Sequence, residues 1–132
     1  GCLPGWVRGA SSIRRWPAGM RQLLGDTLLA AVLATARVPS LTFQTLMRVH
    51  GIGSVDLVKI DAEGFDHVIL RQVVDFAASR AAWPRQIQFE KNMLSDWRAL
   101  DAEVQRLQDD FDYRCHMTGV EEVSCWQPGA MQ

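Results

Sequence analysis

Acidic residues gather in one short segment, "VDLVKIDAEGFDHVIL", which spans residues 55–70. An apolar run ends there in Asp61, Glu63 and Asp66, with Gly64 between the last two. Carboxylates at the edge of a core are costly unless they cap a helix, bind a ligand or react. A positioned carboxylate can accept a proton from a reacting hydroxyl group, and it can also hold a hard divalent ion such as Mg²⁺.

A second polar pair, Glu90 and Asn92, follows the apolar alternation of "RQIQFEKN". In a parallel sheet ligands bind beyond the carboxyl ends of the strands, and neighbouring strands lie about 5 Å apart. We therefore expect Asp61, Glu63, Glu90 and Asn92 to converge on one crevice. Because Ile87 and Phe89 alternate with polar residues, one face of this strand should border a site or the solvent.

Two other interpretations of these residues remain open. Asp61 can be the N-cap of the following helix, and Glu90 an ordinary charged strand end. Capping does not explain Gly64 in the first turn, because a glycine there indicates a sharp bend or a close approach of the backbone. Asp61, Glu90 and Asn92 could also hold Mg²⁺, although our preferred interpretation includes no metal.

The elements that must position these residues follow from periodicity. Alternating strands and helices predict an α/β domain with a largely parallel sheet, and the last segment predicts an antiparallel hairpin that turns near Thr118. Residues 1–132 should form one domain that begins with a loop-rich segment, 1–19. We expect helices near 20–36, 43–50, 64–77 and 97–107, strands near 55–60 and 86–90, and a hairpin within 111–127.

Composition excludes several classes of protein. The formal net charge of −1 gives no basis for nucleic-acid binding, and it argues against a nuclease or hydrolase that would use the Asp-x-Glu pair. Segment 20–36 imitates a secretory signal, but it is internal, Asp26 interrupts it, and it is too short to span a membrane. Cys2, Cys115 and Cys125 are an odd, sparse set, which predicts a cytoplasmic protein with reduced thiols and no zinc site.

The acidic segment resembles the signature of FkbM-type methyltransferases, in which an apolar strand runs into K-I-D-x-E-G-x-[ED] and then a helix. "LTFQTLMRVHGIG" is similar to the family's helix before that strand, "WPRQIQFEKN" to its Pro-x-x-Ile-x-x-Glu strand, and "GWVRGASSI" to its Gly-x-x-Ser segment. The resemblance covers residues 5–113. The matching signature residues are Lys59, Ile60, Asp61, Glu63, Gly64, Asp66 and Leu70.

The resemblance implies an S-adenosylmethionine-dependent enzyme with a Rossmann-like sheet that methylates a hydroxyl group of a small molecule or sugar. On this interpretation Asp61 accepts the proton of the acceptor, and Glu63 and Glu90 orient the acceptor. The remaining candidates for substrate binding are Ser11, Ser12, Lys59, Gly64 and Asn92.

The chain departs from the family pattern at the cofactor. Enzymes of this class place a glycine-rich turn after their first strand, whereas Gly51 and Gly53 precede a strand here. We therefore expect a truncated domain that holds the second half of the fold, with the edge of strand 55–60 either exposed or capped by the N-terminal segment. The alternative is a non-catalytic α/β half-domain, or a partner-binding remnant without affinity for the cofactor.

Overall fold

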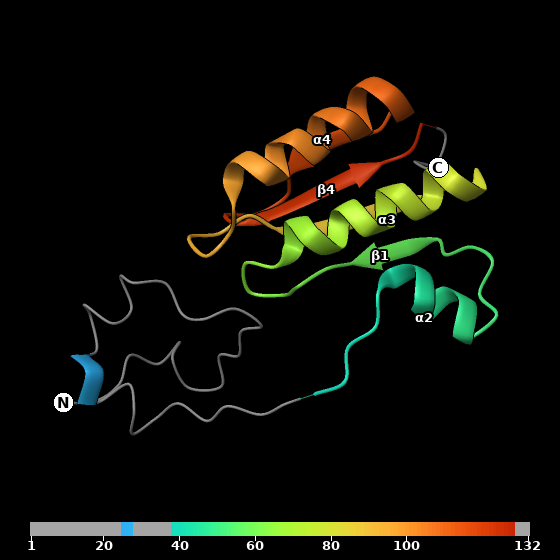
Figure 1. Ribbon diagram of the computed structural model, residues 1–132. Coiled ribbons are helices and arrows are strands. Elements are labelled where there is room, and N and C mark those ends of the chain that lie inside the picture. The colour runs from blue at the N-terminus through green and yellow to red at the C-terminus, as the bar shows by residue number, and fades with distance from the viewer. Residues whose placement is uncertain (1–24, 28–37, 129–132) are drawn as a thin grey trace. The chain divides into compact units, whose positions relative to one another are not determined.

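The computed structural model describes residues 25–27 and 38–128 (Figure 1). The chain divides into two compact units, Gly1–Val38 and Pro39–Gln132, and the candidate site residues from Lys59 onward all belong to the second unit. Of the helix expected at 20–36, only residues 25–27 are described, and these are helical. The expected loop at 1–19 lies outside the described residues.

The second unit contains a four-stranded sheet in the order β1-β2-β4-β3. Its strands are β1 (Leu57–Lys59), β2 (Gln86–Glu90), β3 (Arg114–Met117) and β4 (Glu122–Trp126). Only β1 and β2 pair in parallel, while β4 runs antiparallel to both β2 and β3. The α/β class and the hairpin are therefore confirmed, but the prediction of a mostly parallel sheet is wrong. The short turn after β3 reverses the chain, and β4 then inserts between β2 and β3 instead of extending the edge.

The helices described in this unit are α2 (Phe43–Val49), α3 (Asp66–Arg80) and α4 (Trp97–Phe111). In Figure 1, α3 and α4 lie side by side across the sheet. Helix α2 packs against α3, where the ring centroids of Phe43 and Phe76 lie 5.5 Å apart. The carboxylate of Asp96 caps α4 by accepting a hydrogen bond from the Ala99 N–H at 3.1 Å. Arg106 on α4 donates to Asp75 on α3 at 2.7 Å, which joins the two helices.

The core lies between the sheet and α3 and α4. Along β2 the predicted alternation is confirmed, because Ile87 and Phe89 are buried at 0% and 1% exposure while their polar neighbours are half-buried. On the polar side, Gln88 Nε2 donates to Ser124 Oγ of β4 at 3.2 Å. The buried cluster consists of Ile60, Leu70, Val73, Val74, Ile87, Phe89, Leu100, Leu107, Tyr113, Val123 and Cys125.

Strand β1 is an edge strand within the described part of the chain. Its Asp56 carbonyl and Ile60 N–H hydrogen-bond to β2, at 3.0 and 2.8 Å. The N–H and C=O groups of the alternate residues Leu57 and Lys59 consequently point away from the sheet. The Leu57 side chain is 53% exposed. No described residue pairs with this edge.

Cys115 and Cys125 face each other across β3 and β4 and form a disulfide. The prediction of reduced, buried thiols is therefore wrong for this pair. Two cysteines directly opposite on antiparallel strands have their side chains on the same face and close enough to be bonded. Cys2 lies outside the described residues.

Tyr113 is buried in the core, and its titration gives a measurable prediction. Its hydroxyl donates to the carbonyl of Pro84, and burial raises its pKa to about 12. Because the pKa is higher in the folded chain than the ordinary value, the folded protein resists loss of this proton, and stability falls as the pH rises from 10 towards 12. Tyr113 is the only tyrosine, so phenolate absorbance at about 295 nm should report it alone.

We expect that absorbance to titrate near pH 12 in the native protein and near pH 10 in urea. The Tyr113→Phe variant should lose about 1 kcal/mol of unfolding free energy, since the Pro84 carbonyl loses its donor. A native midpoint near 10 would contradict the buried environment.

Candidate active site

The carboxyl ends of β1 and β2 meet at one edge of the sheet, as expected for parallel neighbours. Asp61 follows β1 after one residue, and Glu90 is the last residue of β2. Because β4 runs antiparallel to β2, it begins at the same edge, and Glu122 lies opposite Glu90. The Lys91 N–H donates to the Glu121 carbonyl at 2.6 Å, which holds the start of β4 at this edge.

The segment between β1 and α3, residues 61–65, is a tight loop and not a helix cap. Helix α3 begins at Asp66, and its N-cap residue Phe65 makes no side-chain capping bond. The interpretation of Asp61 as an N-cap is therefore wrong, because Asp61 precedes the helix by several residues. Glu63 and Gly64 both have positive φ angles, 47° and 93°. This conformation turns the chain sharply before the helix starts.

Gly64 makes the close backbone approach that its position predicted. A Cβ atom at this residue would lie 2.3 Å from the carbonyl oxygen of Leu94. Leu94 belongs to the loop between β2 and α4, residues 91–96, so the contact packs the two loops of the site against each other. The close neighbour of Gly64 is thus the protein's own backbone.

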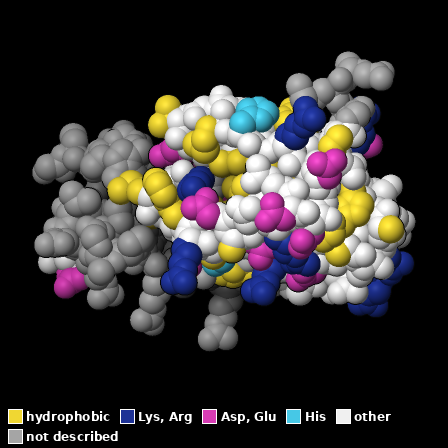
Figure 2. Space-filling model, turned by 90° about the horizontal axis from the view of Figure 1, so that it is seen from above, with side chains coloured by type: hydrophobic (Ala, Val, Ile, Leu, Met, Phe, Trp, Pro, Cys, Tyr) yellow, Lys and Arg dark blue, Asp and Glu magenta, His cyan; other side chains and the backbone are white. Residues whose placement is uncertain are grey.

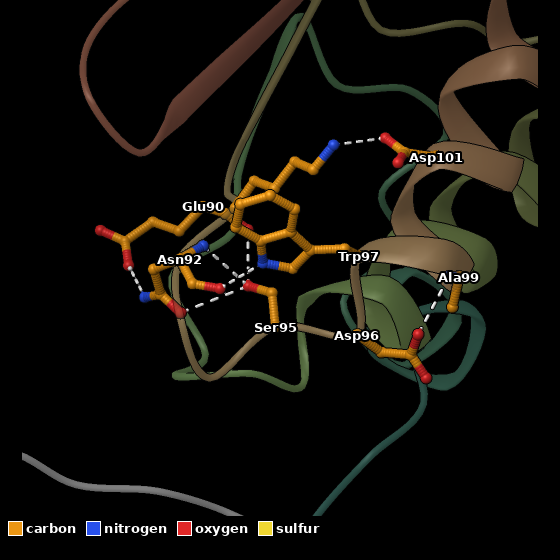
Figure 3. Close-up of polar contacts among 8 residues, drawn as sticks. Glu90, Asn92, Ser95, Asp96, Trp97, Ala99 and Asp101 are labelled. Carbon is orange, nitrogen blue, oxygen red and sulfur yellow. Dashed lines mark hydrogen bonds and ion pairs between the residues drawn. The ribbon is translucent and has the colours of Figure 1, made fainter.

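Asn92 and its neighbours fix the orientation of Glu90 (Figure 3). Asn92 Nδ2 donates to Glu90 Oε2 at 3.0 Å, and its Oδ1 accepts from the Leu94 N–H at 2.9 Å. Ser95 Oγ donates to the Glu90 carbonyl at 3.3 Å, and Trp97 Nε1 donates to the Asn92 carbonyl at 2.6 Å. Asn92 is only 7% exposed, and its amide bonds both to the Glu90 carboxylate and to the loop that follows β2.

The environment raises the pKa of two of the predicted carboxyl groups. Burial is the largest cause for Glu63, followed by the charges of Asp61, Asp66 and Glu121. Burial is also the largest cause for Glu90, and the same three acids and Glu63 raise its pKa further. Both carboxylates are therefore stronger proton acceptors than an isolated glutamate.

The other predicted site residues divide into two groups. Asp61 and Lys59 are exposed at this edge, and Lys59 forms no ion pair with any residue that the structure describes. Ser11 and Ser12 lie outside the described residues. The structure thus brings Asp61, Glu63 and Glu90 within electrostatic reach of one another.

Two acids at this edge were not predicted to belong to the site. Asp66 is completely buried and accepts hydrogen bonds from the Gly64 N–H at 3.1 Å and the Glu90 N–H at 3.4 Å. The motif contained Asp66, but an acid in the first turn of a helix is common enough to carry no signal of its own. Glu121 reaches the site only through the insertion of β4, which no local pattern indicates.

The described residues offer neither a cluster of acidic, histidine or cysteine ligands for a metal ion nor a glycine cradle for the cofactor that the resemblance implies. Among them, no group of three or more histidine, cysteine, aspartate or glutamate side chains could hold a metal ion. The carboxylates suit the positive charge of a sulfonium ion, but Gly64 already packs on the Leu94 carbonyl and offers no cradle. Gly51 and Gly53 lie before β1, away from the carboxyl edge. We assign none of these residues to holding the cofactor.

The surface gives no sign of a polyanion-binding groove on the face seen in Figure 2. Acidic and basic side chains lie intermixed there, with no broad field of one charge. No helix within the described residues is both long and apolar enough to cross a membrane.

A comparison with protein families matches one family model, the Methyltransferase FkbM domain, over residues 12–115. The match covers most of the chain and includes both loops of the candidate site. No curated protein and no solved structure matches the chain.

Proposed function

Because the chain belongs to the FkbM methyltransferase family, we propose that it catalyses transfer of a methyl group from S-adenosylmethionine to a hydroxyl oxygen of a small molecule or sugar. The observation that carries this proposal is the pair of half-buried carboxyl groups, Glu63 and Glu90, at the carboxyl edge of the sheet. Methylation of a hydroxyl group requires a base that takes its proton, and such a base works best when its pKa lies close to the working pH.

Glu90 is the residue that we propose as the proton acceptor. Its carboxylate is held by Asn92 Nδ2 at 3.0 Å, and its pKa is raised by burial and by the surrounding acids. The hypothesis drawn from the sequence gave this role to Asp61, which is exposed and follows the other strand. We propose that Asp61 and Glu63 orient the acceptor and keep the pKa of Glu90 high.

The remaining predicted contacts to the acceptor stay part of the proposal. Lys59 is exposed beside the carboxyl edge, where its ammonium group can reach an oxygen of the acceptor. Ser11 and Ser12 are proposed as hydrogen-bond donors because of their place in the family pattern. We propose that Gly64 and Asn92 contribute by shaping the loops and not by touching the acceptor.

The Glu90→Gln variant tests the proton-acceptor role. An amide cannot take up the proton, so methyl transfer from labelled S-adenosylmethionine should fall at least about 100-fold. The thermal midpoint at pH 7 should rise, because the substitution removes one of several like charges in a partly buried cluster. Lower activity together with higher stability is expected of a functional site and not of a structural one.

The raised pKa of Glu90 also determines how the stability of the protein changes with pH. The pKa of Glu90 is higher in the folded chain than in the unfolded one, so this group favours unfolding as the pH rises above the ordinary carboxyl range. In the Glu90→Gln variant, stability should therefore fall less as the pH rises. Glu122→Gln on the facing strand is the matched control and should retain activity. Full activity of Glu90→Gln would exclude Glu90 as the base.

The second candidate is a non-catalytic α/β module, because the described residues lack a glycine-rich turn after a strand. Calorimetry with S-adenosylmethionine separates the two proposals directly. Micromolar binding to the chain supports the enzyme, and no binding at millimolar cofactor supports the module.

A further inference from the structure

Asp66 is buried in a way that an ordinary first-turn acid does not require. A carboxylate at a helix N-terminus benefits from the helix dipole even when it is fully exposed to water. Asp66 instead has 0% exposure and forms no ion pair with any described residue. Burying a charge without a cation is costly, so both of its oxygens need hydrogen-bond donors.

The two donors come from the two separate segments of the candidate site. Oδ2 accepts from the N–H of Gly64, which lies in loop 61–65 beside Glu63. Oδ1 accepts from the N–H of Glu90, the last residue of β2. The Asp66 carboxylate therefore joins the main chain at Gly64, next to Glu63, to the main chain at Glu90.

A second contact joins the same two regions. The backbone of Gly64 packs on the carbonyl of Leu94, which lies four residues after Glu90. Loop 61–65 is thus held by the hydrogen bond that the Gly64 N–H donates to Asp66 and by direct contact with loop 91–96. Glu63 and Gly64 can keep their positive φ angles because these contacts oppose relaxation of the loop.

We propose that Asp66 is a positioning residue, which fixes loop 61–65 to the end of β2 and so sets the placement of Glu63 relative to Glu90. It does not touch the acceptor, and it acts through the backbone of Gly64 and Glu90. The catalytic consequence rests on the proposed function, whereas the geometric claim can be tested without turnover.

The test is amide hydrogen exchange in the Asp66→Asn variant. Asparagine has one acceptor oxygen, and its NH₂ group would face the second N–H, so at least one of the two bonds is lost. We expect exchange at Gly64 and Glu90 to accelerate at least tenfold, while the ladder between β3 and β4 changes by less than threefold. Asp75→Asn, the same substitution at an exposed position of α3, should leave Gly64 and Glu90 unchanged.

Uniform acceleration throughout the sheet would mean that Asp66 only stabilises the fold, and unchanged exchange at Gly64 and Glu90 would mean that it holds nothing. Either result overturns the proposal. If Asp66→Asn does not fold, the wild-type protein still tests the proposal by NMR. The amide protons of Gly64 and Glu90 should both be protected from exchange, because both donate to one buried carboxylate. Exchange of either amide at the rate of an unfolded chain would refute the bridge.

Activity provides a separate measurement. If the chain transfers methyl groups, Asp66→Asn should lower kcat at least tenfold and change the KM for S-adenosylmethionine less than twofold, because the acceptor and not the cofactor is misplaced. Absence of activity in the wild-type chain would defeat the proposed function but leave the exchange result intact.

Discussion

Replacing Gly64 by alanine should cost about 3–4 kcal/mol of unfolding free energy, the largest effect that we expect from removing or adding a single methyl group in this chain. Two costs combine at this residue. The φ angle of 93° strains any side chain, and the new Cβ would lie 2.3 Å from the Leu94 carbonyl oxygen. The loops must therefore separate, which should also abolish methyl transfer.

Two other glycines allow these costs to be separated by urea denaturation. Gly51 has a φ of 64° but open space around it, so Gly51→Ala should cost only about 1 kcal/mol. Gly53 has open space and no strained φ, so Gly53→Ala should stay within about 0.5 kcal/mol of the wild type. If Gly64→Ala resembles Gly51→Ala, the contact with Leu94 contributes nothing.

Reduction of the disulfide between Cys115 and Cys125 should lower the unfolding free energy by about 2–3 kcal/mol. The bond closes a short loop, with a sequence separation of 10, and so restricts the unfolded chain. Urea denaturation with and without a phosphine reductant measures the difference. The Cys115→Ala/Cys125→Ala double variant is the control, because its stability should not respond to the reductant.

Thiol counting provides an independent check of the same bond. With three cysteines in the chain and two of them paired, the denatured, unreduced protein should show one reactive thiol, that of Cys2. Three reactive thiols would contradict the pairing. In a reducing compartment such as the cytoplasm, which the cysteine content predicted, the protein would lose this contribution to stability.

The order and type of the secondary-structure elements were predictable because each depends on local periodicity. The strand before Asp61, the alternation of β2 and the turn near Thr118 are all local patterns. The position of β4 was not predictable, since periodicity does not determine which strands become neighbours. The pairing of Cys115 with Cys125 was missed for the same reason, because it depends on the register between β3 and β4.

The candidate site was predictable where it depended on strand ends. Glu63 and Glu90 were found because parallel strands bring their carboxyl ends to one edge, and Gly64 because its position indicated a close approach. Asp66 was not assigned to the site, because its place in a helix does not reveal that it is buried. Its burial is what distinguishes it from an ordinary first-turn acid. Glu121 depended on the insertion of β4 beside β2.

The position of β4 also has a consequence for how this unit forms during translation. Among the strands that the structure describes, β4 is the last to leave the ribosome, yet it lies in the interior of the sheet with β2 and β3 on either side. Until residues 122–126 have been synthesised, β2 and β3 each lack a neighbour, and Val123 and Cys125 are missing from the core. The nascent chain therefore carries two unpaired strand edges until a late stage, and such edges can pair with other chains.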